Sequence, residues 1–161
     1  MARHGIVSLV GAALVFGAAL ARAADDDSIK PDLKQAKFKA AEGVPAELFG
    51  YNEGEGKLFF YTNGKAELTV KLPGDGEYEI VVKASGDPAQ NERAKFKLEL
   101  AGEAVGKETT LTADDPKDYK FTAKGKAGEQ KLTIEFTNDV YKEGEYDRNL
   151  YVHAVKLEKK K

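Results

Sequence analysis

The chain has no cysteine and no tryptophan, and only two of its 161 residues are histidine. Without cysteine, an exported protein has no disulfides, so a hydrophobic core or a bound metal must stabilise its fold. Two histidines are too few for a His-rich zinc site. A Ser-His-Asp mechanism would have to use His153 as its base, because His4 lies in an N-terminal segment that we expect to be removed.

The one long apolar run lies at the N-terminus. Arg3 and His4 precede 15 mainly apolar residues, from Ile6 to Leu20, and the small-x-small sequence 21–23 follows. This arrangement is typical of a secretory signal peptide, and the run is shorter than the roughly 20 residues that span a bilayer. We expect cleavage after Ala23 and a secreted or periplasmic protein without a membrane anchor.

The remaining 138 residues carry 23 basic and 27 acidic side chains, a net charge of −4. This length is typical of one domain. No basic stripe is present, which excludes the electrostatic binding that nucleic-acid partners require. We expect a signal peptide at 1–23, a flexible N-terminal segment at 24–36, one domain at 37–158 and a basic tail at 159–161. No internal repeat is visible, and we expect a monomer.

Polar and apolar residues alternate along much of the domain. Four long segments with this period of two are typical of half-buried antiparallel strands: 66–72, 77–84, 95–100 and 130–136. Shorter strand candidates are 38–41, 58–61, 109–111, 119–123 and 150–157. Turn sequences such as TNGK and PGDGE separate these segments, and no convincing amphipathic helix is present. The pattern predicts an all-β fold, an antiparallel β-sandwich.

One connection between expected strands is unusually acidic. The segment 136–152 reads FTNDVYKEGEYDRNLYV, and five carboxylates lie in it or just upstream: Glu135, Asp139, Glu143, Glu145 and Asp147. Clustered carboxylates repel each other unless they are solvated or share a cation. Calcium suits such a loop, since it takes six to eight oxygen ligands in irregular geometry. A solvated acidic turn is the alternative.

An EF-hand does not fit this segment. Counted from Asp139, the third position is Tyr141 and the twelfth is Leu150, where an oxygen ligand and a glutamate are needed. Calcium would therefore be held by Asp139, Asp147 and a second loop, for which the segment 86–92, GDPAQNE, is the candidate.

The sequence motifs FTNDVY and DRNLYV lie at the end of a β-rich exported chain. They resemble those of the calcium-dependent xylan-binding modules of carbohydrate-binding module families 36 and 60. The upstream sequence from GYNEGEGKLFFYTNGK to KASGDPA is also similar, so the resemblance covers about residues 37–158. It implies a jelly-roll sandwich that binds polysaccharide, xylan or a related β-glycan, without catalysis. Vicinal sugar hydroxyls would occupy open positions on a loop-bound calcium ion.

The resemblance also implies roles for particular residues. Asp139 and Asp147 would be carboxylate ligands of the calcium ion, with Glu92 as a third. Such a metal-anchored sugar needs no stacking indole, in agreement with the absence of tryptophan.

Four further residues are expected at the ligand site: Tyr141, Tyr146, Arg148 and Asn149. The two tyrosines either flank the sugar or pack down on the loop. Arg148 is expected to pair with a ligand carboxylate or with loop carbonyls, with sugar contact as the alternative. Asn149 is expected to orient the loop.

Two other classes of function remain open from the sequence. A small glycosidase would use Glu92 and Asp147, which would have to lie about 5 Å or about 6.5–9.5 Å apart. A structural or protein-interaction sandwich would keep the fold without binding sugar. A polysaccharide turnover assay tests the first alternative, and calorimetry with calcium tests the second.

Overall fold

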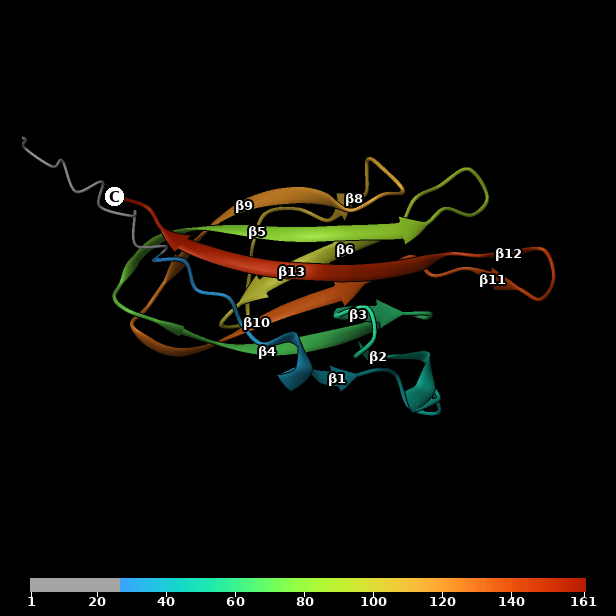
Figure 1. Cartoon of the computed structure of the whole chain (residues 1–161), viewed down its shortest axis with the longest axis horizontal. Coiled ribbons are helices and arrows are strands. Elements are labelled where there is room, and N and C mark those ends of the chain that lie inside the picture. The colour runs from blue at the N-terminus through green and yellow to red at the C-terminus, as the bar shows by residue number, and fades with distance from the viewer. Residues whose placement is uncertain (1–26) are drawn as a thin grey trace, which may run out of the picture.

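The computed structural model describes residues 27–161, so the expected signal peptide at 1–23 lies outside the described part of the chain. Two antiparallel sheets pack face to face (Figure 1). The six-stranded sheet has the order β1-β4-β10-β6-β7, with β8 paired to β6. The five-stranded sheet has the order β2-β3-β13-β5-β9. The predicted all-β fold, an antiparallel sandwich of the jelly-roll kind, is confirmed.

The strands of the six-stranded sheet are β1 Lys37–Lys39, β4 Gly64–Leu72, β6 Lys95–Leu100, β7 Glu103–Ala104, β8 Thr109–Thr110 and β10 Gly128–Phe136. Those of the five-stranded sheet are β2 Phe49–Asn52, β3 Lys57–Phe60, β5 Gly76–Asp87, β9 Lys117–Gly125 and β13 Asn149–Lys159. A separate hairpin joins β11 Tyr141–Lys142 to β12 Tyr146–Asp147. Two 3-10 helices, η1 Leu33–Gln35 and η2 Ala46–Leu48, complete the described elements.

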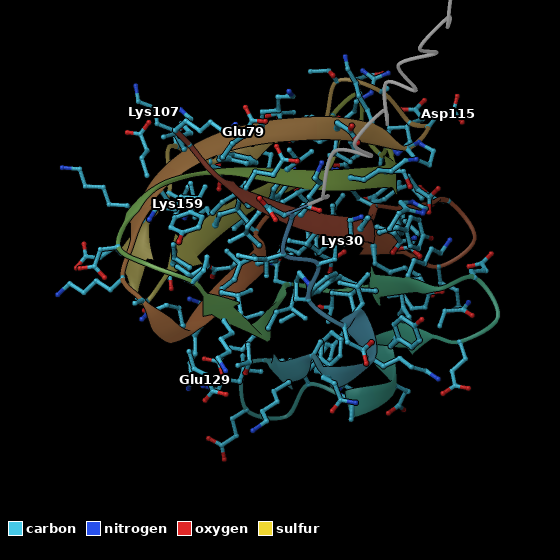
Figure 2. The ribbon with its side chains drawn as sticks, turned by 60° about the vertical axis from the view of Figure 1, so that its left-hand side comes forward. Lys30, Glu79, Lys107, Asp115, Glu129 and Lys159 are labelled. Carbon is cyan, nitrogen blue, oxygen red and sulfur yellow. The ribbon has the colours of Figure 1, made fainter. Side chains whose placement is uncertain are left out.

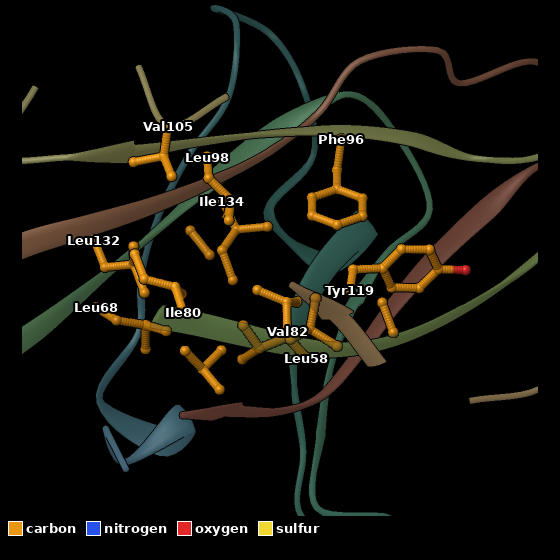
Figure 3. Packing of buried hydrophobic residues seen from close by; sticks show 14 of the residues in the cluster. Leu58, Leu68, Ile80, Val82, Phe96, Leu98, Val105, Tyr119, Leu132 and Ile134 are labelled. Atoms are coloured by element: carbon orange, nitrogen blue, oxygen red, sulfur yellow. The ribbon is translucent and has the colours of Figure 1, made fainter. Parts of the chain in front are cut away.

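The predicted alternation places apolar side chains of both sheets in one core. In β10, Leu132 lies opposite Leu68 of β4 and Leu100 of β6, and all three are buried. Ile80 and Val82 enter the same core from β5 (Figure 3). Full burial of such a side chain stabilises the fold by about 1.5–3 kcal/mol, so this core replaces the missing disulfides.

Charged side chains alternate with the core residues and cover the outer faces of the sheets. Figure 2 shows Lys107 and Glu129 directed away from the ribbon. Across the six-stranded sheet, Lys65 of β4 lies 3.2 Å from Glu135 of β10. Glu135, one of the five clustered carboxylates, is therefore a surface ion-pair partner. Such solvated pairs contribute little to stability.

Strand β13 contains a bulge between Val152 and Ala154. Val152 faces the core before the bulge and Val155 faces it afterwards, because the extra residue, His153, has no partner in β5. Without this residue, the rest of the strand would turn its apolar side chains to solvent.

The N-terminal segment differs from the expectation of a flexible lead from 24 to 36. Ile29 forms a bridge with Leu157 of β13, with both backbone hydrogen bonds at 2.8 Å. Leu33 is only 8% exposed and belongs to the core. Two apolar side chains in a polar segment are enough to fix it, because each has a place against the sandwich. No helix in the part of the chain from residue 27 onward is long and apolar enough to cross a membrane.

Candidate functional site

A pocket of about 500 Å³ opens beside the β11–β12 hairpin, at one end of the sandwich. We call it the loop pocket; it is lined by Leu48, Tyr61, Thr62, Asp139, Tyr141 and Asp147. The two aspartates proposed from the sequence as metal ligands therefore lie on one cavity. Tyr141, proposed to flank a sugar, lines the same cavity and is 63% exposed.

The pairing of β10 with β4 explains why these residues meet. Phe136 lies opposite Gly64 at the end of this ladder, so the residues that follow Phe136 come beside those that precede Gly64. The backbone N–H of Asp139 donates to Oδ1 of Asn63 at 2.8 Å. Asp147 reaches the pocket through the β11–β12 hairpin, in which it lies opposite Tyr141.

Two carboxylates share the loop pocket, and the charged form of Asp139 is disfavoured there. Burial raises the pKa of Asp139, and the nearby charge of Asp147 raises it further. A hydrogen bond from the side chain of Thr62 and the charge of Arg148 oppose this rise in pKa. A cation between the two carboxylates would remove the repulsion.

Three buried oxygens at this site lack a hydrogen-bond partner: Oδ1 of Asp139, Oδ1 of Asp147 and Oδ1 of Asn149. Buried polar atoms without partners are rare in folded proteins, and an ion is one common explanation. Carboxylate and amide oxygens are ligands that calcium prefers. The residues present therefore fit a calcium ion.

The protein side chains provide only part of a calcium coordination shell. Among residues 27–161, no three His, Cys, Asp or Glu side chains come together as a metal-binding group. A calcium ion on two aspartates would keep positions for carbonyls, water or a ligand, since it takes six to eight oxygens.

Glu92 is not brought to the two aspartates. Its carboxylate is largely exposed and lies 3.6 Å from Nζ of Lys95 and 3.7 Å from Nη2 of Arg148. It does not line the loop pocket. Glu92 was expected as a third calcium ligand, but in this position it is not part of the metal site that we propose. Glu145, another of the clustered carboxylates, pairs with Lys142 at 2.5 Å at the tip of the hairpin.

Arg148 is buried and its guanidinium is occupied by backbone carbonyls. Nη2 donates to the carbonyl of Ala89 at 2.5 Å, Nη1 to that of Asn138 at 2.6 Å and Nε to that of Glu92 at 3.3 Å. The side chain ties the turn at 89–92 to the chain that enters the loop pocket. This arrangement agrees with the expectation of pairing with loop carbonyls, and leaves no free face for sugar contact.

Asn149 links the loop pocket to the five-stranded sheet. Its Nδ2 atom lies 3.1 Å from Oδ2 of Asp147 and 3.1 Å from Oδ2 of Asp87. The Tyr151 hydroxyl donates to the same Asp87 oxygen at 2.7 Å. Asn149 was expected to orient the loop, and these hydrogen bonds hold the Asp147 carboxylate against the end of β5.

One side of the loop pocket is formed by residues that were not expected at the site. Leu48, Tyr61 and Thr62 line it, yet TNGK at 62–65 was interpreted only as a turn. Tyr61 is 40% exposed and packs edge-on against Tyr151, with ring centroids 6.3 Å apart. In the sequence, the one feature that could have pointed to this side of the pocket was an aromatic residue, Tyr61, directly before the turn TNGK. Tyr146 is half-buried on β12 and does not line the pocket.

Comparisons with solved structures find the same fold in carbohydrate-binding modules. The CBM36-1 domain of a multidomain xylanase, from the hindgut metagenome of Trinervitermes trinervoides, has a TM-score of 0.62 at 14% identity, covering 84% of this chain and 99% of that one. A CBM36 module in complex with calcium and xylotriose has a TM-score of 0.51 at 16% identity, covering 81% and 97%. A family 35 module from Clostridium thermocellum has a TM-score of 0.55 at 14% identity, covering 81% and 96%. No curated protein matches the chain.

The family itself is shown by the sequence. The model of CBM60, described as a Ca-dependent, xylan-binding carbohydrate-binding module, matches residues 79–161, which is just over half of the chain and includes both aspartates of the loop pocket. The chain belongs to this family of calcium-dependent, xylan-binding carbohydrate-binding modules, CBM60.

Proposed function

We propose that this protein binds a xylan-like polysaccharide through a calcium ion held by Asp139 and Asp147, and that it does not catalyse a reaction. The observation that carries the proposal is a pair of buried carboxylate oxygens without partners, one from each of the two aspartates that line the same pocket. Family membership and the calcium and xylotriose in the similar CBM36 complex support it.

A calcium ion held by Asp139 and Asp147 would supply coordination positions for two vicinal hydroxyls of a sugar. The protein's own residues prepare the site for this. Asn149 orients the Asp147 carboxylate, and Arg148 fixes the two loops on which the site depends. Tyr61 and Tyr141 are exposed on the pocket and provide its apolar walls for the sugar ring.

The proposal includes the location and the oligomeric state of the protein. The N-terminal signal pattern predicts a secreted or periplasmic protein, in which one module, preceded by a cleaved segment at 1–23, acts as a monomer. The exported location suits a polysaccharide ligand. We propose no glycosidase function for Glu92 and Asp147, because the carboxylate of Glu92 is engaged by cations away from the loop pocket.

A glycan array tests the proposal directly. We expect binding to xylan-type glycans with calcium, and loss of that binding with a chelator or in Asp147→Ala. Glu143→Ala is the matched control, because it removes an exposed charge from the same hairpin outside the pocket. Undiminished binding with the chelator or in Asp147→Ala would overturn the metal mechanism. A calorimetric calcium response with no sugar response would indicate a structural role instead, and product release from xylan would indicate an enzyme.

A further inference from the structure

A second cavity, of about 380 Å³, lies between the N-terminal segment and the outer face of the five-stranded sheet. We call it the sheet groove; its walls come from 30–33, Tyr51, Gly56, Lys83, Asp118 and 153–156. Small-molecule sites have volumes of about 300–1,000 Å³, so the groove is large enough for a ligand. It shares no lining residue with the loop pocket.

The groove lies at a gap in the hydrogen-bonding of β13. On this edge, β3 pairs with β13 only at 150–152, and Ile29 pairs with it at Leu157. Leu157 directs its N–H and C=O toward Ile29, so those of Val155, two residues earlier, point to the same edge. No strand among residues 27–161 pairs with Val155 there. The groove thus offers a backbone donor and acceptor to a ligand.

Side chains add further polar groups on the groove wall. The imidazole of His153 is fixed by a 2.8 Å hydrogen bond between its Nε2 and Oγ of Ser85. Lys83 and Asp118 are cross-strand partners on β5 and β9 and both line the groove. Both residues are exposed, so their side chains can meet a ligand's hydroxyl groups.

The character of the walls favours an uncharged, amphipathic ligand. Most of the lining surface is apolar, and three lysines and two aspartates nearly balance in charge. A sugar ring matches this combination, because its C–H faces pack on apolar walls while its hydroxyls meet a few polar groups. A polyanion or a cation would find no excess of opposite charge.

The groove and the loop pocket both lie near strand β13. Tyr61 of the loop pocket contacts Tyr151 of β13, and His153 of the groove follows Tyr151 two residues later in the same strand. Figure 1 shows β13 running from the β11–β12 hairpin along the length of the sheet. Residues along β13 and beside it therefore lie next to both cavities.

We propose that the sheet groove is a second binding subsite for a neutral saccharide chain of the xylan class. The choice of ligand rests on the proposed function, but the groove would bind the sugar directly and not through a calcium ion. The groove has backbone and side-chain groups that can meet sugar hydroxyls directly. Binding in the groove therefore does not depend on calcium.

Amide NMR spectra of the protein titrated with xylohexaose, in calcium and in chelator, test this inference. In chelator we expect the amide signals of His153 and Val155 to shift while those of Asp139 and Tyr141 stay in place. In calcium both sets should shift. Unmoved His153 and Val155 signals under both conditions would overturn the inference. Unmoved loop signals in calcium, with shifting groove signals, would overturn only the function proposed for the loop pocket.

A steric block gives a second test. Ala154 is exposed and lines the groove, so Ala154→Lys is expected to fill it without disturbing the core. We expect xylohexaose affinity in chelator to fall about tenfold or more. Ala104→Lys, at an exposed position of β7 in the other sheet, is the matched control and should leave affinity unchanged. Equal affinities for the two variants would contradict the proposal, and the shifts in the wild type test it even if Ala154→Lys does not fold.

Discussion

The side-chain amide of Asn149 donates a hydrogen bond of 3.1 Å to Oδ2 of Asp147, two residues earlier in the chain. The other oxygen of this carboxylate, Oδ1, is buried and has no partner. One oxygen of the carboxylate is thus bonded within the protein, and the other has no partner. Groups that fix a metal-binding carboxylate from outside the coordination shell commonly strengthen metal binding.

Loss of this hydrogen bond should weaken calcium binding. We expect Asn149→Ala to lower calcium affinity by about 10–100-fold, as calorimetry would measure, because the Asp147 carboxylate loses its orientation. Asn52→Ala is a suitable control, since the Asn52 side chain bonds only to Glu55 in the turn between β2 and β3. Wild-type calcium affinity in Asn149→Ala would show that Asp147 is oriented by other contacts.

Calcium should stabilise the wild-type protein and lose that effect in Asp139→Asn. A ligand at 100 times its Kd adds about 2.7 kcal/mol to the free energy of unfolding, which raises the Tm by several degrees. In chelator, Asp139→Asn should be at least as stable as the wild type, because the change removes a partly buried charge that Asp147 repels. Thermal unfolding with calcium and with chelator measures both effects. An equal rise in Tm for the two proteins would argue against Asp139 as a ligand.

Arg148→Lys should destabilise the fold although it keeps the charge. A lysine ammonium does not reproduce the planar guanidinium that bonds the carbonyls of Ala89, Glu92 and Asn138. We expect a loss of about 3 kcal/mol in urea unfolding, from buried carbonyls left without donors. Arg93→Lys, which changes an exposed pair with Asp114, should cost less than about 1 kcal/mol. Similar losses in the two variants would contradict the role of Arg148 as a tie between loops.

Stability should fall in mild acid because of His153. Burial lowers the pKa of His153 from 6.5, the charges of Lys57 and Lys83 lower it further, and Glu55 opposes them. The unfolded chain therefore takes up the proton at a higher pH than the native protein, and the free energy of unfolding falls as pH drops below about 6.5. His153→Gln should lack this part of the pH dependence, while its amide can still bond Ser85. Urea unfolding of the two proteins at about pH 7.5 and about pH 5.5 measures this difference. If the free energy of unfolding changes equally with pH in both proteins, His153 has the same pKa in the folded and unfolded chain.

The sequence predicted strands best where alternation is long. The segment 95–100 was expected as a strand and is β6 with the same bounds. The hairpin strands β11 and β12 were missed, because two residues each are too few to show a period. The bulge at His153 was also missed, since nothing in the alternation of YVHAV shows where one residue leaves the ladder.

Prediction of the site was similarly uneven. Asp139 and Asp147 were chosen from one acidic segment and its resemblance to the family, and both line one pocket. Their metal role itself remains a proposal. Glu92 was chosen for its position in a neighbouring loop, but an ion pair with Lys95 and Arg148 holds it elsewhere. Tyr61 was not chosen, since about 80 residues of sequence separate it from the aspartates.

The sequence by itself determined the sandwich and the core faces, because a period of two decides locally which side chains are buried. It also determined the family, because the motifs that identify the family are short contiguous segments. Only the tertiary structure decided which loops meet. The pairing of Phe136 with Gly64 brings Asn63 to Asp139, and the gap between β3 and Ile29 along β13 leaves the sheet groove open. Both follow from strand order and register, which depend on contacts between distant segments.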